Sequence, residues 1–209
     1  MSFQKNINKY WDYLEQKYSP PRYVGKVKYM DFESLKNVID NKNEKHLKKI
    51  IKNMYVKKEA YILRNSAKKQ LKNTILDLVN HYKKTRKTSF HKMFNGTPNF
   101  HRVIDKDITK KYSLFAIKHS FYFYNWNIRS KLEKNFKDGV YKHWRYVKYL
   151  AGNNKNQFEK NIPSDNQIDR LQIIRYPAGG GELRSHVDPR KNQRIVSGLI
   201  MSKVGEDFI

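Results

Sequence analysis

The sequence predicts an α+β protein in which a mainly helical region precedes a short region of strands. Apolar residues recur at helical spacing through most of residues 1–150. Two apolar runs, Leu171–Tyr176 and Ile195–Met201, have the length and composition of strands. The excess of positive charge also ends near residue 150. We therefore predict a basic, mainly helical region over 1–150, a linker over 151–169 and strands over 170–209.

The N-terminal part of the chain contains the signals for three helices. A run of aromatic and apolar residues before Pro20 fits one face of a short helix, and the proline ends it. Arg22–Met30 alternates only in part, which is compatible with a strand or an extended connector. Asp31–Met54 is predicted to form two helices, with Asp31 as the N-cap of the first and Asn41–Asn43 as the turn between them.

Two longer helices are predicted on either side of an apolar segment. Lys57–Lys84 carries an apolar stripe with lysines opposite, so one continuous helix is predicted there. Tyr112–Ile128 is the most apolar segment, and its aromatic and β-branched content indicates a buried strand or a buried helix without deciding between them. Ser130–Leu150 is predicted to be a helix with Ser130 as its N-cap and with Gly152 beyond its end.

The composition excludes several classes of protein. The chain of 209 residues has no cysteine, which excludes a disulfide framework and a thiolate metal site. No apolar run reaches the length of about 18 residues that a membrane span needs. The first residues also lack the apolar stretch of a secretory signal. We therefore expect a cytoplasmic location and no membrane partner.

The positive charge is concentrated in the first part of the chain. Residues 1–150 hold 35 basic and 12 acidic residues, a net charge of +23, whereas residues 151–209 hold nine basic and seven acidic residues, a net charge of +2. A field of that size attracts polyanions such as nucleic acid. Two interpretations stay open: a surface that binds anions, or a compositional bias that leaves lysines on solvated faces. No helix-turn-helix, RNA-recognition or zinc motif supports nucleic-acid binding.

His186 and Asp188 form the strongest candidate site in the sequence. Side chains alternate faces along a strand, so residues two apart lie on the same side and one divalent metal ion can contact both. A histidine and a carboxylate, completed by a second histidine, form the facial triad of non-haem Fe(II) oxygenases. The alternative interpretation is a histidine beside an aspartate that caps the turn at Pro189.

The residues around this pair resemble the catalytic barrel of the 2-oxoglutarate/Fe(II)-dependent oxygenases. A strand ends at Tyr176, the cluster Gly179–Gly181 follows, and His186 and Asp188 precede a returning strand. Ser202–Phe208 also looks like a later segment of that family. The resemblance, carried by the last 40 residues, implies the first strands of a jelly-roll barrel, the double-stranded β-helix, incomplete at its C-terminus. It also implies Fe(II) and 2-oxoglutarate as cofactors and a hydroxylase-type reaction.

Four residues receive roles in this hypothesis. His186 would bind Fe(II) through a neutral imidazole nitrogen and Asp188 through a carboxylate oxygen. Tyr176 resembles the tyrosines that hydrogen-bond the distal carboxylate of 2-oxoglutarate, and its alternative is a packed strand aromatic. Arg184 shares the face of His186 if the strand extends that far and would then meet an anionic substrate group; its alternative is a surface arginine. The substrate, a small molecule or a protein side chain, is not specified.

The sequence departs from the family pattern after Asp188. Family members carry a second histidine ligand downstream, followed by an arginine or lysine that pairs with 2-oxoglutarate. Here no histidine follows His186, and the chain ends 21 residues after Asp188. We therefore expect a truncated, inactive chain or one that has lost the chemistry of the oxygenases. The alternative function is that of a basic protein that binds polyanions or nucleic acid without catalysis. The upstream histidines available as substitute ligands are His91, His101, His119 and His143.

Overall fold

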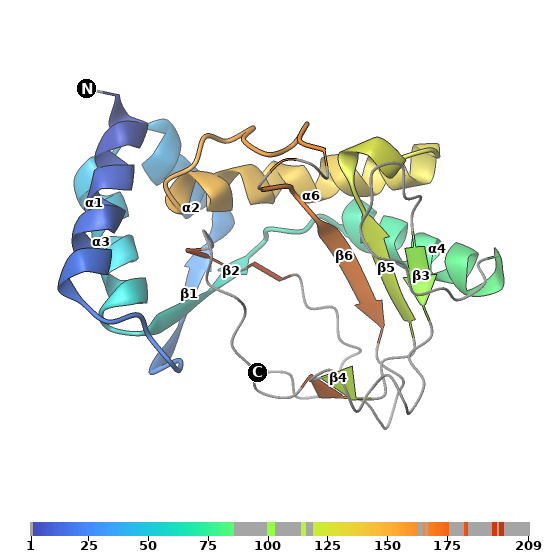
Figure 1. Cartoon of the computed structure of the whole chain (residues 1–209), viewed down its shortest axis with the longest axis horizontal. Coiled ribbons are helices and arrows are strands. Elements are labelled where there is room, and N and C mark those ends of the chain that lie inside the picture. The colour runs from blue at the N-terminus through green and yellow to red at the C-terminus, as the bar shows by residue number, and fades with distance from the viewer. Residues whose placement is uncertain are drawn as a thin grey trace. The chain divides into compact units, whose positions relative to one another are not determined.

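A computed structural model of the chain describes residues 2–85, 100–102, 114–115, 119–162, 165, 167–175, 182–183, 194–195 and 197–198. Helices and strands are both present, which confirms the mixed fold class (Figure 1). The described strands form one parallel pair, one three-stranded antiparallel sheet and one short antiparallel pair. A jelly-roll barrel is not present among these strands.

The described residues fall into two compact units, and each unit is described by itself. The first unit draws its residues from Met1–Lys68, Val140–Gln157 and Pro189–Ile209, and the second from Lys69–Gly139 and Phe158–Asp188. The units are interleaved along the chain, whereas the ranges expected from the sequence are consecutive. The linker at 151–169 stays a prediction.

Helix α1, Phe3–Lys17, begins the first unit. Its N-cap is Ser2, whose hydroxyl accepts a backbone hydrogen bond of 3.3 Å from the first turn. The side chains of Ile7, Trp11 and Leu14 recur at helical spacing and are buried. The helix predicted before Pro20 is therefore confirmed.

A strand pair and two helices follow in the first unit. They are β1 (Lys26–Asp31), α2 (Phe32–Asp40), α3 (Glu44–Tyr55) and β2 (Glu59–Arg64). Parallel strands need a crossover between them, and α2 and α3 supply it. The Asp31 carboxylate caps α2 by accepting a backbone N–H at 2.8 Å, and the Asn43 side chain caps α3 at 3.1 Å. Both helices predicted within Asp31–Met54 are confirmed.

The continuous helix predicted over Lys57–Lys84 is wrong in its first part. Strand β2 occupies that part, and helix α4, Lys69–Thr85, begins only after it. Lys58 and Asn65, which flank β2, have positive φ angles of 59° and 60°. A residue in this region of backbone space cannot continue a right-handed helix. The apolar residues of β2 are compatible with a helix or a strand. As a strand, β2 pairs with β1, and this pairing gives its backbone N–H and C=O groups hydrogen-bond partners.

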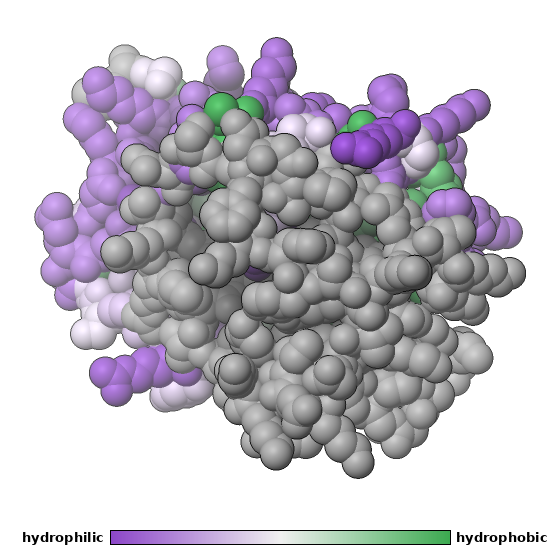
Figure 2. Space-filling view, turned by 45° about the vertical axis from the view of Figure 1, so that its right-hand side comes forward, coloured by the Kyte–Doolittle hydropathy of each residue, from purple (hydrophilic) through white to green (hydrophobic). Residues whose placement is uncertain are grey.

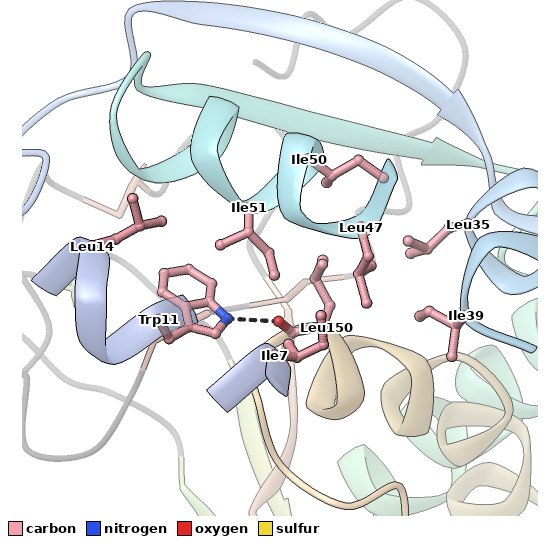
Figure 3. Packing of buried hydrophobic residues seen from close by; sticks show 9 residues of the cluster. All are labelled: Ile7, Trp11, Leu14, Leu35, Ile39, Leu47, Ile50, Ile51 and Leu150. Atoms are coloured by element: carbon pink, nitrogen blue, oxygen red, sulfur yellow. Dashed lines mark hydrogen bonds between the residues drawn. The ribbon is translucent and has the colours of Figure 1, made fainter. Parts of the chain in front are cut away.

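Buried side chains of α1, α2 and α3 form the core of the first unit together with Leu150 (Figure 3). Trp11 is only 1% exposed, and its indole N–H donates a hydrogen bond of 2.8 Å to the carbonyl oxygen of Leu150. The single polar atom of this large side chain is therefore satisfied inside an apolar core. The buried members of the cluster are Ile7, Trp11, Leu14, Leu35, Ile39, Leu47, Ile50, Ile51 and Leu150.

The described part of the second unit contains α4, the short 3-10 helix η1 (Asn125–Asn127) and several short strands. These strands are β3 (Phe100–Arg102), β4 (Leu114–Phe115), β5 (His119–Phe123), β6 (Leu171–Arg175) and β7 (Glu182–Leu183). An antiparallel sheet has the order β3-β5-β6, and β4 pairs with β7. Strand β6 confirms the predicted strand that precedes Tyr176. The apolar segment Tyr112–Ile128, left open between strand and helix, contains β4, β5 and η1.

Helix α6, Lys131–Leu150, contributes residues to both units. A capping box begins it: the Ser130 hydroxyl accepts the backbone N–H of Glu133 at 3.1 Å, and the Glu133 carboxylate accepts that of Ser130 at 3.0 Å. Gly152, with φ of 91°, lies just beyond the C-terminal end. The predicted helix, N-cap and terminating glycine are confirmed.

The strand predicted over Ile195–Met201 lies mostly outside the described residues. Ile195, Ser197 and Gly198 are described and have no regular secondary structure. At these three positions the predicted strand is wrong. Ile195 packs against the core of the first unit instead, where hydrophobic contact takes the place of a strand partner.

Candidate functional site

Two antiparallel stretches of chain pair with each other before the predicted metal pair in the sequence. Strand β6 pairs with β5 up to the contact of His119 with Arg175, and pairing resumes between β4 and β7 where Phe115 meets Glu182. The described pairing thus covers two parts of the same two stretches. Between these parts, three residues on one stretch and six on the other, including Gly179–Gly181, lie outside the described residues.

The four residues that received roles in the sequence analysis lie outside the described residues. They are Tyr176, Arg184, His186 and Asp188. The structure therefore does not bring them together or separate them, and their roles stay predictions. Described strands do reach this region, because β6 ends directly before Tyr176 and β7 ends directly before Arg184.

Three of the four upstream histidines can be placed, and their settings differ. His101 lies in β3 and His119 in β5, and His119 pairs with the last residue of β6. His143 on α6 is 8% exposed, and its Nδ1 atom has no hydrogen-bond partner among the described residues. Burial lowers the pKa of His143 below its ordinary value, so this side chain is a neutral packing group at neutral pH. His91 lies outside the described residues.

Two negative findings apply to the described part of the chain only. There, no three side chains of the histidine, cysteine, aspartate or glutamate type are grouped so that they hold a metal ion. None of the helices in that part combines the length and the apolar character needed to cross a bilayer. The cytoplasmic location stays a prediction.

Arg194 binds to helix α1 in the first unit. Its guanidinium group donates hydrogen bonds to the carboxylates of Asp12 at 2.7 Å and Glu15 at 2.9 Å. The guanidinium carbon also lies 5.6 Å from the ring centre of Trp11. Sequence reasoning missed this cluster because 179 residues separate Arg194 from Glu15, and no local pattern marks such a contact.

An apolar cavity of about 290 Å³ lies in the first unit beside Arg194. The polar groups at its edge bond to one another: the Tyr61 hydroxyl donates to Glu59 at 2.8 Å and accepts from the Asn53 amide at 3.4 Å. Burial raises the pKa of Tyr61, so the hydroxyl stays protonated at neutral pH. The cavity offers contact to an apolar group, and its described lining contains no grouping suited to metal binding.

Aromatic and cationic side chains are exposed on and beside the β1–β2 pair. The guanidinium carbon of Arg64 lies 4.5 Å from the ring centre of Tyr29, and the Nζ atom of Lys58 lies 3.9 Å from that of Tyr23. Lys58 also donates a hydrogen bond to the Tyr23 hydroxyl, which lowers the pKa of Tyr23. The partial alternation within Arg22–Met30 was the available sequence signal. It was compatible with a strand or an extended connector and did not indicate this surface.

Comparisons with known proteins do not assign the chain to a family. No protein-family model matches it, and no curated protein and no solved structure is similar to it. The likeness to the oxygenases therefore depends on the motif residues themselves.

Proposed function

We propose that the chain carries the metal-binding motif of an Fe(II)/2-oxoglutarate-dependent oxygenase of the hydroxylase type, with His186 and Asp188 as ligands of the iron. The observation that carries this proposal is the ordered pattern of a strand, a glycine cluster and the His-x-Asp pair. Strands β6 and β7 support it, because the proposal requires strands on both sides of Gly179–Gly181. The proposal extends to the first strands of a double-stranded β-helix.

The donor atoms suit the proposed metal. A neutral imidazole nitrogen and a carboxylate oxygen are ligands that Fe(II) accepts, and they leave coordination positions open for 2-oxoglutarate and O2. When bound, the iron, 2-oxoglutarate and O2 would supply the oxidising power that inserts one oxygen atom of O2 into a C–H bond, while 2-oxoglutarate would become succinate and CO2. Tyr176 would donate its hydroxyl hydrogen to the distal carboxylate of 2-oxoglutarate. Arg184 would pair with an anionic group of the substrate.

The proposal assigns the third protein ligand to His119. Strand register places the backbone of His119 opposite Arg175, where β6 ends. Paired residues share a face, so the proposal requires the regular alternation to end at Arg175 for His119 and Tyr176 to reach one pocket. His143 is a poorer choice because it is a buried side chain on α6, and its Nδ1 atom is packed without a partner among the described residues. A neutral imidazole at position 119 would complete the two-histidine, one-carboxylate set without any residue beyond Asp188.

Cobalt binding tests the metal site directly. Co(II) replaces Fe(II) without reacting with O2, and its absorption spectrum reports the number of ligands. We expect the full 209-residue chain to bind one Co(II) ion, and we expect His186→Ala and Asp188→Ala to lose most of that affinity. His119→Ala should lower the affinity and change the spectrum, because it removes one nitrogen donor.

His46 provides the matched control for these variants. It is an exposed histidine on α3, so His46→Ala should bind Co(II) as the unmodified chain does. Equal binding by His186→Ala and the unmodified chain would remove the basis of the proposed function. If His119→Ala bound Co(II) normally while His186→Ala and Asp188→Ala did not, only the assignment of His119 as the third ligand would be rejected. Because an inactive chain is expected, binding rather than turnover tests the cofactor: 2-oxoglutarate should change the Co(II) spectrum, and Tyr176→Phe should reduce that change at low 2-oxoglutarate.

A further inference from the structure

The β1–β2 pair has one face toward the core of the first unit and an outer face. Met30, Tyr61 and Leu63 pack against that core. Successive residues of a strand point to opposite faces, and directly paired residues share a face. The register therefore places a second set on the outer face, namely Val27, Tyr29, Asp31, Ala60, Ile62 and Arg64.

Exposed apolar side chains are concentrated in this part of the molecule. Among the described residues, seven large hydrophobic side chains are exposed, and four of them belong to β1–β2 or to the turn before β1. These four are Tyr23, Val24, Tyr29 and Ile62. Tyr29 and Ile62 are register partners and are 61% and 45% exposed. Exposed apolar side chains that gather along one strand pair indicate an interaction surface, whereas single exposed apolar residues do not.

Each exposed tyrosine ring has a cation beside it. Arg64 lies over Tyr29 at 4.5 Å and Lys58 over Tyr23 at 3.9 Å. In the described part of the chain, neither cation forms an ion pair with a carboxylate. Both positive charges are therefore available to an anion, while the rings hold them in place.

The acidic residues near this surface are already engaged. Asp31 accepts hydrogen bonds from the Asn65 amide at 2.6 Å and from the first turn of α2 at 2.8 Å. Glu59 belongs to the inner face and accepts from Tyr61. Residues 22–31 and 56–65 together hold six basic residues against these two acids. Hydrophilic residues also dominate the described surface on the side of the molecule shown in Figure 2.

We propose that the β1–β2 surface, consisting of Tyr23, Tyr29, Lys58, Ile62 and Arg64, binds single-stranded nucleic acid. Tyr29 and Tyr23 would stack on bases, while Arg64 and Lys58 would contact phosphates. This inference names the kind of polyanion that the positively charged chain would bind. It does not depend on the proposed oxygenase function.

The combination of groups favours a single strand over other anions. Bases of a duplex are stacked on one another and cannot cover exposed tyrosine rings, whereas unpaired bases can. An acidic peptide would satisfy the cations and leave the rings exposed. The two cation–aromatic pairs lie near opposite ends of the strand pair, about 20 Å apart at roughly 3.3 Å per residue. That length accommodates several nucleotides of extended chain.

Fluorescence anisotropy with a short fluorescein-labelled oligothymidylate tests the proposal. We expect Tyr29→Ala to weaken binding by roughly 5- to 150-fold, which is the effect of losing one base–aromatic stack. Tyr29→Phe keeps the ring and should bind as the unmodified chain does. Arg64→Gln should reduce the slope of log affinity against log salt by about 1, because one phosphate contact is lost.

Tyr13 on α1 provides a matched control. It is 47% exposed and has Lys17 over its ring at 5.4 Å, so it repeats the same chemistry at another place. Tyr13→Ala should leave the affinity unchanged, and His186→Ala should as well. Equal losses in Tyr13→Ala and Tyr29→Ala, or no loss in either, would show that binding is general charge attraction and would overturn the assigned surface.

Three further probes separate the nucleic acid from other partners. A duplex of the same length, poly-glutamate and vesicles that contain phosphatidylserine should each bind more weakly. Tyr29→Ala should not change their binding, because it leaves the charge of the chain unchanged. Binding to any of these that is tighter than to oligothymidylate and depends on Tyr29 would reassign the surface to that class of partner. Circular dichroism spectra establish that each variant is folded.

Discussion

The parallel pair β1–β2 and the antiparallel sheet β3–β5–β6 both consist of short strands, but their pairing arises differently. The parallel pair is joined through α2 and α3, whose caps and apolar spacing are local in the sequence. In the antiparallel sheet, Phe123 pairs with Leu171, which lies 48 residues further along the chain. One sheet is therefore closed by neighbouring elements and the other by a distant strand.

The cores beneath the two sheets differ in the same way. In the first unit, side chains from three helices and Leu150 form one cluster around Trp11. In the second unit, Phe123 contacts Phe136 with 4.9 Å between ring centres, and Leu171 and Ile173 are buried at alternate positions of β6. Strand β6, which precedes the proposed metal ligands in the sequence, therefore depends on long-range packing. Four substitutions test this difference, in order of decreasing expected effect.

Trp11→Ala should have the largest effect, because it empties the centre of the first core. Removal of a buried aromatic side chain costs about 3–5 kcal/mol, and here the hydrogen bond to Leu150 is lost as well. Urea unfolding measures the loss. The exposed Tyr13→Ala should change the free energy of unfolding by no more than about 0.5 kcal/mol. A Trp11→Ala chain as stable as Tyr13→Ala would contradict the proposed core.

Ile173→Ala tests the antiparallel sheet. Ile173 is 7% exposed, and its truncation should cost about 2–5 kcal/mol. Ile174, the neighbour on the other face of β6, is only partly buried, so Ile174→Ala should cost less. Amide hydrogen exchange should rise in β5 and β6 more than in α1. Equal losses for the two isoleucines would mean that β6 is not buried on one face only.

Arg194→Gln tests the attachment of the C-terminal residues to α1. The partners Asp12 and Glu15 have side chains that are 49% and 38% exposed, so solvent screening limits the loss to about 1 kcal/mol. The loss should shrink as salt is added. Lys134→Gln removes an ion pair of 3.4 Å between more exposed side chains and serves as the control. If the loss of stability in Arg194→Gln did not change with salt concentration, the packing of Arg194 on Trp11 would be its main contribution to stability.

Asp31→Asn should have the smallest effect at neutral pH, because asparagine is also a good N-cap. Hydrogen bonds from Asn65 and then from the backbone of Glu33 hold the pKa of Asp31 below its ordinary value of 3.8. A lowered folded pKa means that the stabilisation is present above the unfolded pKa and is lost as the pH falls through the folded value. Stability curves below about pH 4 should therefore fall less steeply for Asp31→Asn. If stability fell equally steeply with decreasing pH in the unmodified chain and in Asp31→Asn, the Asp31 carboxylate would not contribute to the acid dependence.

Predictions from the sequence succeeded where the signals are local. Asp31 and Ser130 were recognised as N-caps, because a short polar side chain before an apolar periodic run satisfies the free N–H groups of a helix start. The prediction for β2 failed because its apolar residues also fit a helix, and β1 decides between the two. The candidate site was proposed from the residue types of His186 and Asp188 and from the strand and glycine pattern before them. The cation–aromatic contacts of Tyr23 and Tyr29 required the folded strand pair.

The sequence by itself determined the helices α1, α2, α3 and α6, the charge excess and the types of donor atom at the His-x-Asp pair. Periodicity and caps act within a few residues, and charge and donor chemistry belong to individual side chains. Only the tertiary structure decided that β2 is a strand, that Arg194 binds to α1, and that His119 pairs with Arg175. Each of these depends on a partner far along the chain, and the chain has to fold before such partners meet.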